Sequence, residues 1–147
     1  MKKNVAVNVT GIHSRLGEPT EKVETFSEGL YEVLEDGRHI IEYEEHQSQG
    51  DAPVRTRVTI DHDTKGMEIA REGAGSSTLK FRENLEYKTE YVTPYGSMLM
   101  KVCTEKFDFS KRNNEDIHIM VEYSLELEGQ VLSSSAIMME IKNAEAG

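Results

Sequence analysis

A two-residue alternation of apolar and polar side chains recurs along this chain, and it constrains the fold more than any other feature. The clearest stretch runs from Ile117 to Leu127, where every odd position is apolar and polar residues such as His118 and Glu122 take even positions. Successive side chains of an extended strand point to opposite faces, so the pattern indicates a strand with one buried face. Almost no segment shows a convincing helical period. The sequence therefore predicts an all-β protein.

Turn residues divide the chain into short predicted strands. Asp36-Gly37 is the strongest hairpin dipeptide, and it separates strands expected over residues 30–35 and 38–45. Thr93-Pro94-Tyr95-Gly96 is typical of a β-turn with proline at its second position. Further strands are expected over residues 4–11, 54–61, 67–71, around 79–81, and over 85–91, 97–109, 117–127 and 131–141. About eight to ten antiparallel strands in sequential hairpins fit an up-and-down barrel or a sandwich.

One strand carries a signal that favours the barrel. Between residues 97 and 109 the apolar positions are first even (Met98, Met100, Val102) and then odd (Phe107, Phe109). One inserted residue between positions 104 and 106 would produce this switch as a β-bulge, a device that bends barrel strands. The chain has no tryptophan and one cysteine, so the pattern of an immunoglobulin-like sandwich is missing. We expect one closed antiparallel barrel domain over residues 1–147.

The segment between Thr20 and Asp36 is ambiguous. Its apolar residues Val23, Phe26 and Leu30 fall on one face of a helix. Interior Gly29 and the β-branched and aromatic residues of the segment favour strands instead. Periodicity alone leaves both structures open.

Composition restricts the partners and the compartment. With 17 Lys and Arg against 27 Asp and Glu, the net charge is −10, which disfavours nucleic acid and anionic membranes as partners. A single cysteine cannot form an internal disulfide, which suits a reducing cytosol. Val5, Val7 and Val9 alternate with polar residues, so the N-terminus is expected to be a strand and not a signal peptide. No stretch approaches the ~20 apolar residues of a membrane span.

The nearest approach to a metal motif begins at Asp61. Asp61, Asp63, Gly66 and Glu72 match positions 1, 3, 6 and 12 of an EF-hand loop. Lys65 stands where that loop needs an oxygen ligand, and the flanks are predicted strands instead of helices. We therefore expect a charged hairpin turn here and no metal.

Other reactive residues are isolated in the sequence. The chain has five histidines, and they share no ligand spacing: His13, His39, His46, His62 and His118. Two of them, His39 and His118, are on predicted strands and are able to meet inside a barrel, although exposed histidines are the default. A nearby lysine would lower the pKa of the Cys103 thiol, but an inert strand cysteine is the default. Ser133-Ser134-Ser135 lacks the glycines of a nucleophile elbow, and we interpret it as polar strand positions or as part of a polar cavity wall.

Three stretches together resemble a known family. They are Glu28-Gly29-Leu30-Tyr31 with residues 40–45, Thr93-Pro94-Tyr95-Gly96, and residues 123–130. They resemble the YwiB-like family of small bacterial proteins, a domain of unknown function, over nearly the whole chain. The resemblance implies a closed, meandering barrel related to the calycins, which include lipocalins and fatty-acid-binding proteins. It also implies strands for residues 20–36, and it carries over no catalytic or binding residues.

The leading hypothesis is a non-catalytic cytosolic barrel, monomeric or homodimeric, that binds an unidentified small ligand without a cofactor. Barrels of about eight or more strands enclose one small ligand. Arginines inside such a barrel are able to pair a carboxylate with two hydrogen bonds, although ion pairs on the outer surface are their commoner use. The candidate ligand-binding residues are Tyr43, Tyr95, Arg71 and Arg82.

Two alternatives remain open at this point. The chain is a protein-interaction module with a packed, ligand-free interior, or it is an enzyme with a site at the barrel mouth near Tyr95 or His62. The sequence assigns no catalytic residue.

Overall fold

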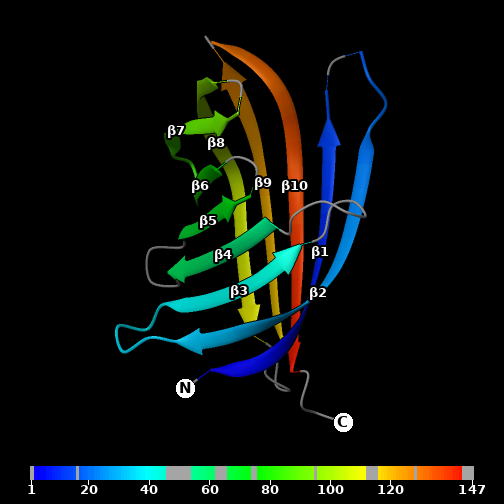
Figure 1. Cartoon of the computed structure of the whole chain (residues 1–147). Helices are drawn as coiled ribbons and strands as arrows, with labels where there is room; N and C mark the ends of the chain where they lie inside the picture. The colour runs from blue at the N-terminus through cyan, green and yellow to red at the C-terminus, as the bar shows by residue number, and fades with distance from the viewer. Residues whose placement is uncertain are drawn as a thin grey trace.

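The structure, a computed structural model, describes residues 2–15, 17–45, 54–61, 66–73, 76–94, 96–111, 116–127 and 129–143. Its strands are β1 (Lys3–Ser14), β2 (Glu21–Val33), β3 (His39–Glu45), β4 (Val54–Asp61), β5 (Gly66–Glu72), β6 (Ser76–Arg82), β7 (Glu86–Thr93), β8 (Gly96–Lys111), β9 (Ile117–Leu127) and β10 (Gln130–Asn143). Each strand pairs antiparallel with its neighbours in sequence, and β1 also pairs with β10, which closes the barrel (Figure 1). The prediction of an all-β, up-and-down closed barrel is confirmed.

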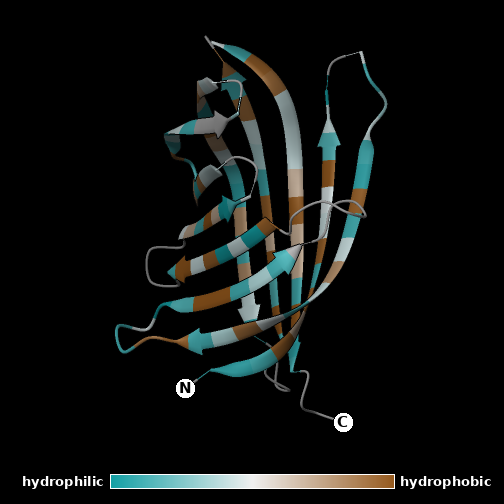
Figure 2. Cartoon of the chain, viewed as in Figure 1, coloured by the Kyte–Doolittle hydropathy of each residue, from teal (hydrophilic) through white to brown (hydrophobic). Residues whose placement is uncertain are grey.

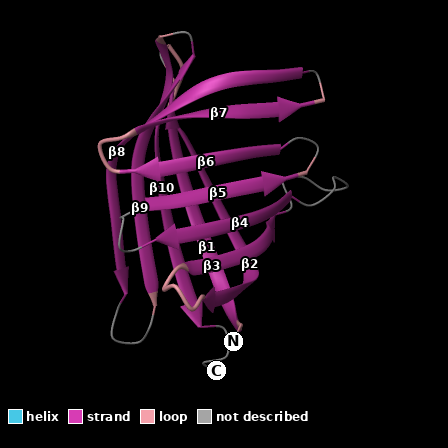
Figure 3. Cartoon of the chain, turned by 90° about the vertical axis from the view of Figure 1, so that its left-hand side faces the viewer, coloured by secondary structure: helices cyan, strands magenta, loops and turns pink. Residues whose placement is uncertain are grey.

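The wall of the barrel consists of long and short strands that cross. In Figure 1, β8, β9, β10 and β1 run along the length of the molecule, whereas β3 to β6 lie across them. Figure 3 shows the same crossing from the side, with β4 to β7 in front of the long strands. The residues that the structure describes include no helix long and apolar enough to cross a bilayer.

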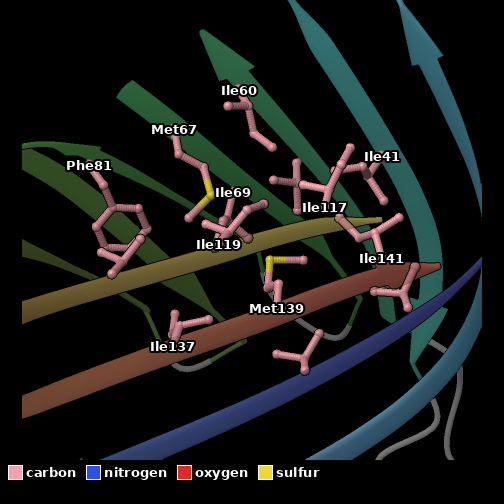
Figure 4. Close-up of a cluster of buried hydrophobic side chains, with 14 of the residues drawn as sticks. Ile41, Ile60, Met67, Ile69, Phe81, Ile117, Ile119, Ile137, Met139 and Ile141 are labelled. Atoms are coloured by element: carbon pink, nitrogen blue, oxygen red, sulfur yellow. The ribbon is translucent and has the colours of Figure 1, made fainter. Parts of the chain in front are cut away.

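The interior is an apolar core made from one parity of each strand. Figure 2 shows hydrophobic and hydrophilic bands alternating along the strands. Figure 4 shows the inward-pointing side chains of β9 and β10 meeting those of β3 to β6. The labelled members are Ile41, Ile60, Met67, Ile69, Phe81, Ile117, Ile119, Ile137, Met139 and Ile141. Because the closed sheet surrounds these side chains, they are buried without any covering helix.

The ambiguous segment is a strand. β2 extends from Glu21 to Val33 and pairs with β1 and β3. Its apolar residues have a helix-like spacing in the sequence because they lie on both faces of the strand. Tyr31 is buried in the core, whereas Phe26 lies on the outer face with 76% of its surface exposed. The resemblance-based expectation of strands is confirmed.

The β-bulge predicted in the longest strand is present. Thr104 pairs with Tyr123, and the next pair is Lys106 with Glu122, so Glu105 is the inserted residue. The insertion returns Phe107 to the interior, where it is buried. A second register shift, between Val131 and Ser133 of β10, was not predicted.

The turn at Asp36-Gly37 is held by its own backbone and side chains. Leu34 N donates to Arg38 O at 2.8 Å, and Gly37 has a φ of 91°, which glycine adopts without strain. The backbone N–H of Arg38 donates to Asp36 at 3.0 Å, and this hydrogen bond, aided by the Arg38 guanidinium, lowers the Asp36 pKa. The hairpin is where the sequence predicts it, with strand ends at Val33 and His39.

The weakest seam in the barrel lies between β6 and β7. These strands share one ladder pair, Ser76 with Val92, whereas β5 and β6 pair along the whole of both strands. A side-chain hydrogen bond from Thr89 Oγ1 to Thr78 O adds a second link. Figure 3 shows the ribbons of β6 and β7 running apart along most of their length.

Candidate ligand-binding site

A first row of polar side chains crosses three strand pairings inside the long-stranded wall. The register places Thr104 of β8 opposite Tyr123 of β9, Tyr123 opposite Ser135 of β10, and Ser135 opposite His13 of β1. Directly opposite residues in an antiparallel sheet point to the same face. Because Tyr123 and Ser135 are buried, this common face is the barrel interior.

A second polar row lies in the short-stranded wall. Tyr43 of β3 is opposite Thr56 of β4, and Thr56 is opposite Arg71 of β5. The Arg71 guanidinium acts electrostatically on the Tyr123 hydroxyl, so the two rows meet across the interior. We call the two rows together the polar belt; its residues are His13, Tyr43, Thr56, Arg71, Thr104, Tyr123 and Ser135.

A pocket of about 470 Å³ opens at the polar belt, at the end of the barrel where β1 ends and β2 begins. Four belt residues line it: His13, Tyr43, Arg71 and Tyr123. The remaining lining is mainly apolar and comes from β1, β2, β5, β6 and β10: Val9, Gly11, Val23, Glu24, Thr25, Ile69, Leu79, Ile137 and Met139. A small apolar cavity with a few converging polar groups is the common composition of ligand sites.

The pocket ends on tightly packed side chains. Ile69, Ile137 and Met139 form its floor and are 3%, 7% and 2% exposed. Beyond the floor the barrel is filled by core residues such as Val58 and Val121, which are completely buried. The pocket therefore occupies one end of the barrel.

The opposite end contains an aromatic cluster. The Tyr31 hydroxyl is 2.5 Å from His39 Nδ1, and the two rings stack with their centroids 5.8 Å apart. The Phe109 ring lies 5.2 Å from the His39 ring. These three side chains, from β2, β3 and β8, fill this end of the interior.

Tyr123 is a neutral hydrogen-bonding group at the centre of the polar belt. Burial raises the pKa of its hydroxyl, and the Ser135 hydrogen bond and the Arg71 charge offset only part of that rise. The Phe81 ring packs against the Tyr123 ring with centroids 4.8 Å apart, which fixes its orientation. The phenol thus remains protonated at neutral pH and is able to donate into the pocket.

His13 and Ser135 are in hydrogen-bond contact, with 2.9 Å between Nδ1 and Oγ. Gly11 makes room for the imidazole, because a Cβ at residue 11 would lie 3.1 Å from His13 Nε2. A serine next to a histidine also occurs in nucleophilic enzymes. Here Ser135 is buried, and its hydroxyl is shared between His13 and Tyr123. We therefore assign Ser135 to positioning the two larger side chains.

The candidate ligand-binding residues have different locations. Tyr43 and Arg71 both line the pocket. Arg82 is exposed on the outer face of β6, in a shallow groove with Arg38 and Asp61, and is not part of this site. Tyr95 lies outside the described residues.

Ion pairs lie on the outer surface of the barrel. Arg55 Nε is 3.6 Å from Glu44 Oε1 across β3 and β4. His118 also faces outward, with Nδ1 3.8 Å from Glu140 Oε2, so it does not meet His39 inside the barrel.

The described residues contain no cluster of three or more potential metal ligands. Asp61 ends β4 and Glu72 ends β5, so both ends of the EF-hand-like stretch are strands, as the sequence indicates. Residues 62–65, and with them His62, lie outside the described part of the chain, as does His46.

Cys103 lies among negative charges. Partial burial, followed by the carboxylates of Glu126 and Glu86, raises the pKa of its thiol. Lys101, the residue that would have lowered the pKa, is 3.4 Å from Glu86 and 3.7 Å from Glu126. The thiol is protonated at neutral pH, which agrees with the default expectation of an inert cysteine.

Sequence reasoning did not select His13 or Tyr123 as site residues, and it considered Ser135 only within a serine run that was expected on a strand or in a polar cavity wall. His13 and Ser135 are 122 positions apart, and only the β1–β10 register brings them together. Strand parity indicates that Tyr123 points inward, because it is at an odd position of β9, like the apolar residues of that strand.

Comparisons with known proteins place the whole fold. A family described as a domain of unknown function (DUF1934) matches residues 7–139. The crystal structure of the ywiB protein from Bacillus subtilis matches with a TM-score of 0.82 and 16% sequence identity, over 97% of this chain and 93% of that chain. At this identity the similarity shows the fold alone. No curated protein matches the chain.

Proposed function

The chain belongs to the DUF1934 family, a domain of unknown function, and we propose that it binds a small organic ligand in the pocket at the polar belt. One observation carries the proposal. A guanidinium, two phenols and an imidazole line a 470 Å³ pocket whose floor is apolar. These groups combine recognition of a polar group with burial of an apolar body.

A purely structural role explains the polar belt less well. Among the described residues, Thr56 Oγ1 and Thr104 Oγ1 are buried without a hydrogen-bond partner. Buried hydroxyl groups are normally satisfied, and leaving one unsatisfied costs about 1–3 kcal/mol. A packed interior would be served better by valine at both positions. Neither threonine lines the pocket, but each is opposite a residue that does: Thr56 is opposite Arg71, and Thr104 is opposite Tyr123.

The wider setting of this function is also a proposal. A cytosolic location agrees with the single cysteine and the net charge of −10, which suit a reducing environment and a soluble protein. The relation to calycins and a bacterial source are proposed from the family resemblance alone. In that setting the protein is a carrier or receptor without catalytic activity.

Native mass spectrometry of gently purified protein tests the proposal. A mass excess that disappears on denaturation is expected for the wild type. Val23→Trp should abolish the excess, because Val23 lines the pocket and a larger ring there fills its mouth. Leu30→Trp is the matched control, since Leu30 is on the same strand and similarly exposed, but faces the outside. A bare wild-type mass, or equal retention by both variants, would contradict the proposal.

A protein-interaction module is the second candidate, favoured by one observation. Phe26, 76% exposed on the outer face of β2, and the exposed Met138 of β10 lie on the two strands that flank β1. Exposed apolar residues that group together often mark protein contacts. The expected partner is a second copy of the chain, and analytical ultracentrifugation should then show a dimer that Phe26→Ser dissociates. A monomer at all concentrations would count against this function.

A further inference from the structure

We infer that the ligand is a compact organic anion, whose acidic group is held by Arg71 and Tyr123 and whose apolar body rests on the pocket floor. This inference rests on the proposed function, because it describes the occupant of the same pocket.

The charge of the ligand follows from the groups on the pocket wall. Arg71 contributes a permanent positive charge with five N–H donors. Tyr123 is close enough to interact with that charge and is a neutral O–H donor. Glu24 is the acidic residue among the described lining residues, and its carboxylate makes an exposed ion pair with Lys22 at 3.1 Å. A positive charge and a neutral O–H donor that line the same pocket from its two walls select an acceptor with negative charge.

The charge of the whole molecule makes this pocket distinctive. The chain has a net charge of −10, which repels anions from its surface as a whole. An anion is therefore bound only where a local positive group outweighs that field. Arg71 is half-buried, and a charged hydrogen bond is stronger in such a site than at the surface.

The size of the ligand follows from the floor. Ile69, Ile137 and Met139 are nearly inaccessible to solvent, and the core beyond them is closely packed. Opening a passage through this layer would break packing that costs about 2–5 kcal/mol per large aliphatic side chain. A long acyl chain that extends straight toward the core would need such a passage. The closed floor thus favours a compact aromatic or branched body over an extended long-chain acid.

Isothermal titration calorimetry with three probes tests the charge and the size separately. The probes are benzoate, its neutral counterpart benzamide, and the long-chain acid dodecanoate. We expect benzoate to bind most tightly. Arg71→Gln should weaken benzoate binding by roughly tenfold to a hundredfold, the effect of losing a charge-assisted hydrogen bond. Arg82→Gln is the matched control, because Arg82 is exposed on the outer face of the neighbouring strand, and it should leave binding unchanged.

A second variant guards against loss of folding. Arg71→Lys keeps the positive charge but not the forked geometry, and it should bind benzoate with intermediate affinity. Circular dichroism of each variant establishes that the barrel is intact before the titration.

The outcomes separate the inference from the proposed function. If benzamide binds as tightly as benzoate and Arg71→Gln changes neither, the pocket binds ligands but the anion inference is wrong. If dodecanoate binds more tightly than benzoate, the size inference is wrong. If neither compact probe binds, the inference fails, and a bare mass in the native spectrum would then remove the proposed function as well.

Discussion

At the scale of single residues, the polar belt depends on a buried phenol. The Tyr123 hydroxyl is held by Ser135 and lies in the field of Arg71, and its pKa is nevertheless raised because burial outweighs both effects. The same balance decides how the residue responds to pH. It also makes Tyr123 a test of the electrostatics of the site that needs no ligand.

Replacing this hydroxyl changes the alkaline stability of the protein. Below the unfolded-state pKa of about 10, Tyr123 is protonated in both states. As pH rises through the higher folded-state pKa, the stability that the protonated phenol contributes is lost. Tyr123→Phe removes the hydrogen bond to Ser135 and should lower the free energy of unfolding by about 1 kcal/mol at pH 7. It should also make the decline above pH 10 shallower, as measured by urea denaturation.

An equally steep alkaline decline in both proteins would show that Tyr123 is not the group responsible. Tyr87→Phe provides a comparison, because Tyr87 is a less buried tyrosine on β7.

The reactivity of Cys103 is a second prediction at this scale. Because burial and the carboxylates of Glu126 and Glu86 raise its thiol pKa, alkylation at pH 8 should be slower than that of a small free thiol. Glu126→Gln removes one of these charges and should speed the reaction, followed with iodoacetamide and mass spectrometry. Rapid modification of the wild type at pH 7 would mean that the thiol is activated.

At the scale of elements, glycines set how closely the strands approach. Gly29 of β2 is opposite Tyr43 of β3, and a Cβ there would lie 2.6 Å from the carbonyl oxygen of Glu42 and 3.1 Å from Tyr43 Cβ. The glycine thus allows β2 to pass close to β3 beneath the pocket. Gly11 of β1 meets only a side chain, the His13 imidazole.

The two glycines should tolerate substitution differently. Gly29→Ala places a methyl group against backbone and should lower the free energy of unfolding by about 1–3 kcal/mol. Gly11→Ala should cost less, since the imidazole can rotate away, but it should disturb the His13–Ser135 contact. Urea denaturation compares the two variants. Equal losses, or a larger loss for Gly11→Ala, would contradict the contacts described here.

The seam between β6 and β7 is the most labile part of the wall. Because β6 and β7 share one ladder pair, the β6 amides that face β7 lack the protection of a continuous ladder. Hydrogen–deuterium exchange should therefore be faster in peptides covering β6 than in peptides covering β9 or β10, which are paired on both sides. Uniform protection around the barrel would show that the seam is closed in solution.

At the scale of the whole molecule, much of the fold was predictable because alternation reports directly which face of a strand is buried. The bulge near Glu105 was visible as a change of parity. The β2 segment was not, since Phe26 is apolar but exposed and breaks the link between hydrophobicity and burial. Gly29 and the β-prone residues of the segment favoured a strand, and the family resemblance decided between the two structures.

The candidate site was harder to predict because it depends on pairing between distant strands. Arg71 shares the parity of Met67 and Ile69, whereas Arg82 has the parity opposite to Phe81, so parity separates the inner from the outer arginine. No local pattern shows that His13 meets Ser135, because their register is fixed by the closure of β1 on β10.

The measurement that tests the central claim most directly is a benzoate titration followed by NMR of protein labelled at the isoleucine and methionine methyl groups. We expect saturable shifts for the floor methyls of Ile69, Ile137 and Met139, with Ile60 and Ile117 in the closed core unchanged. Shifts confined to outer residues such as Met138, or no saturable shift at the floor, would contradict a site for compact organic anions in this pocket.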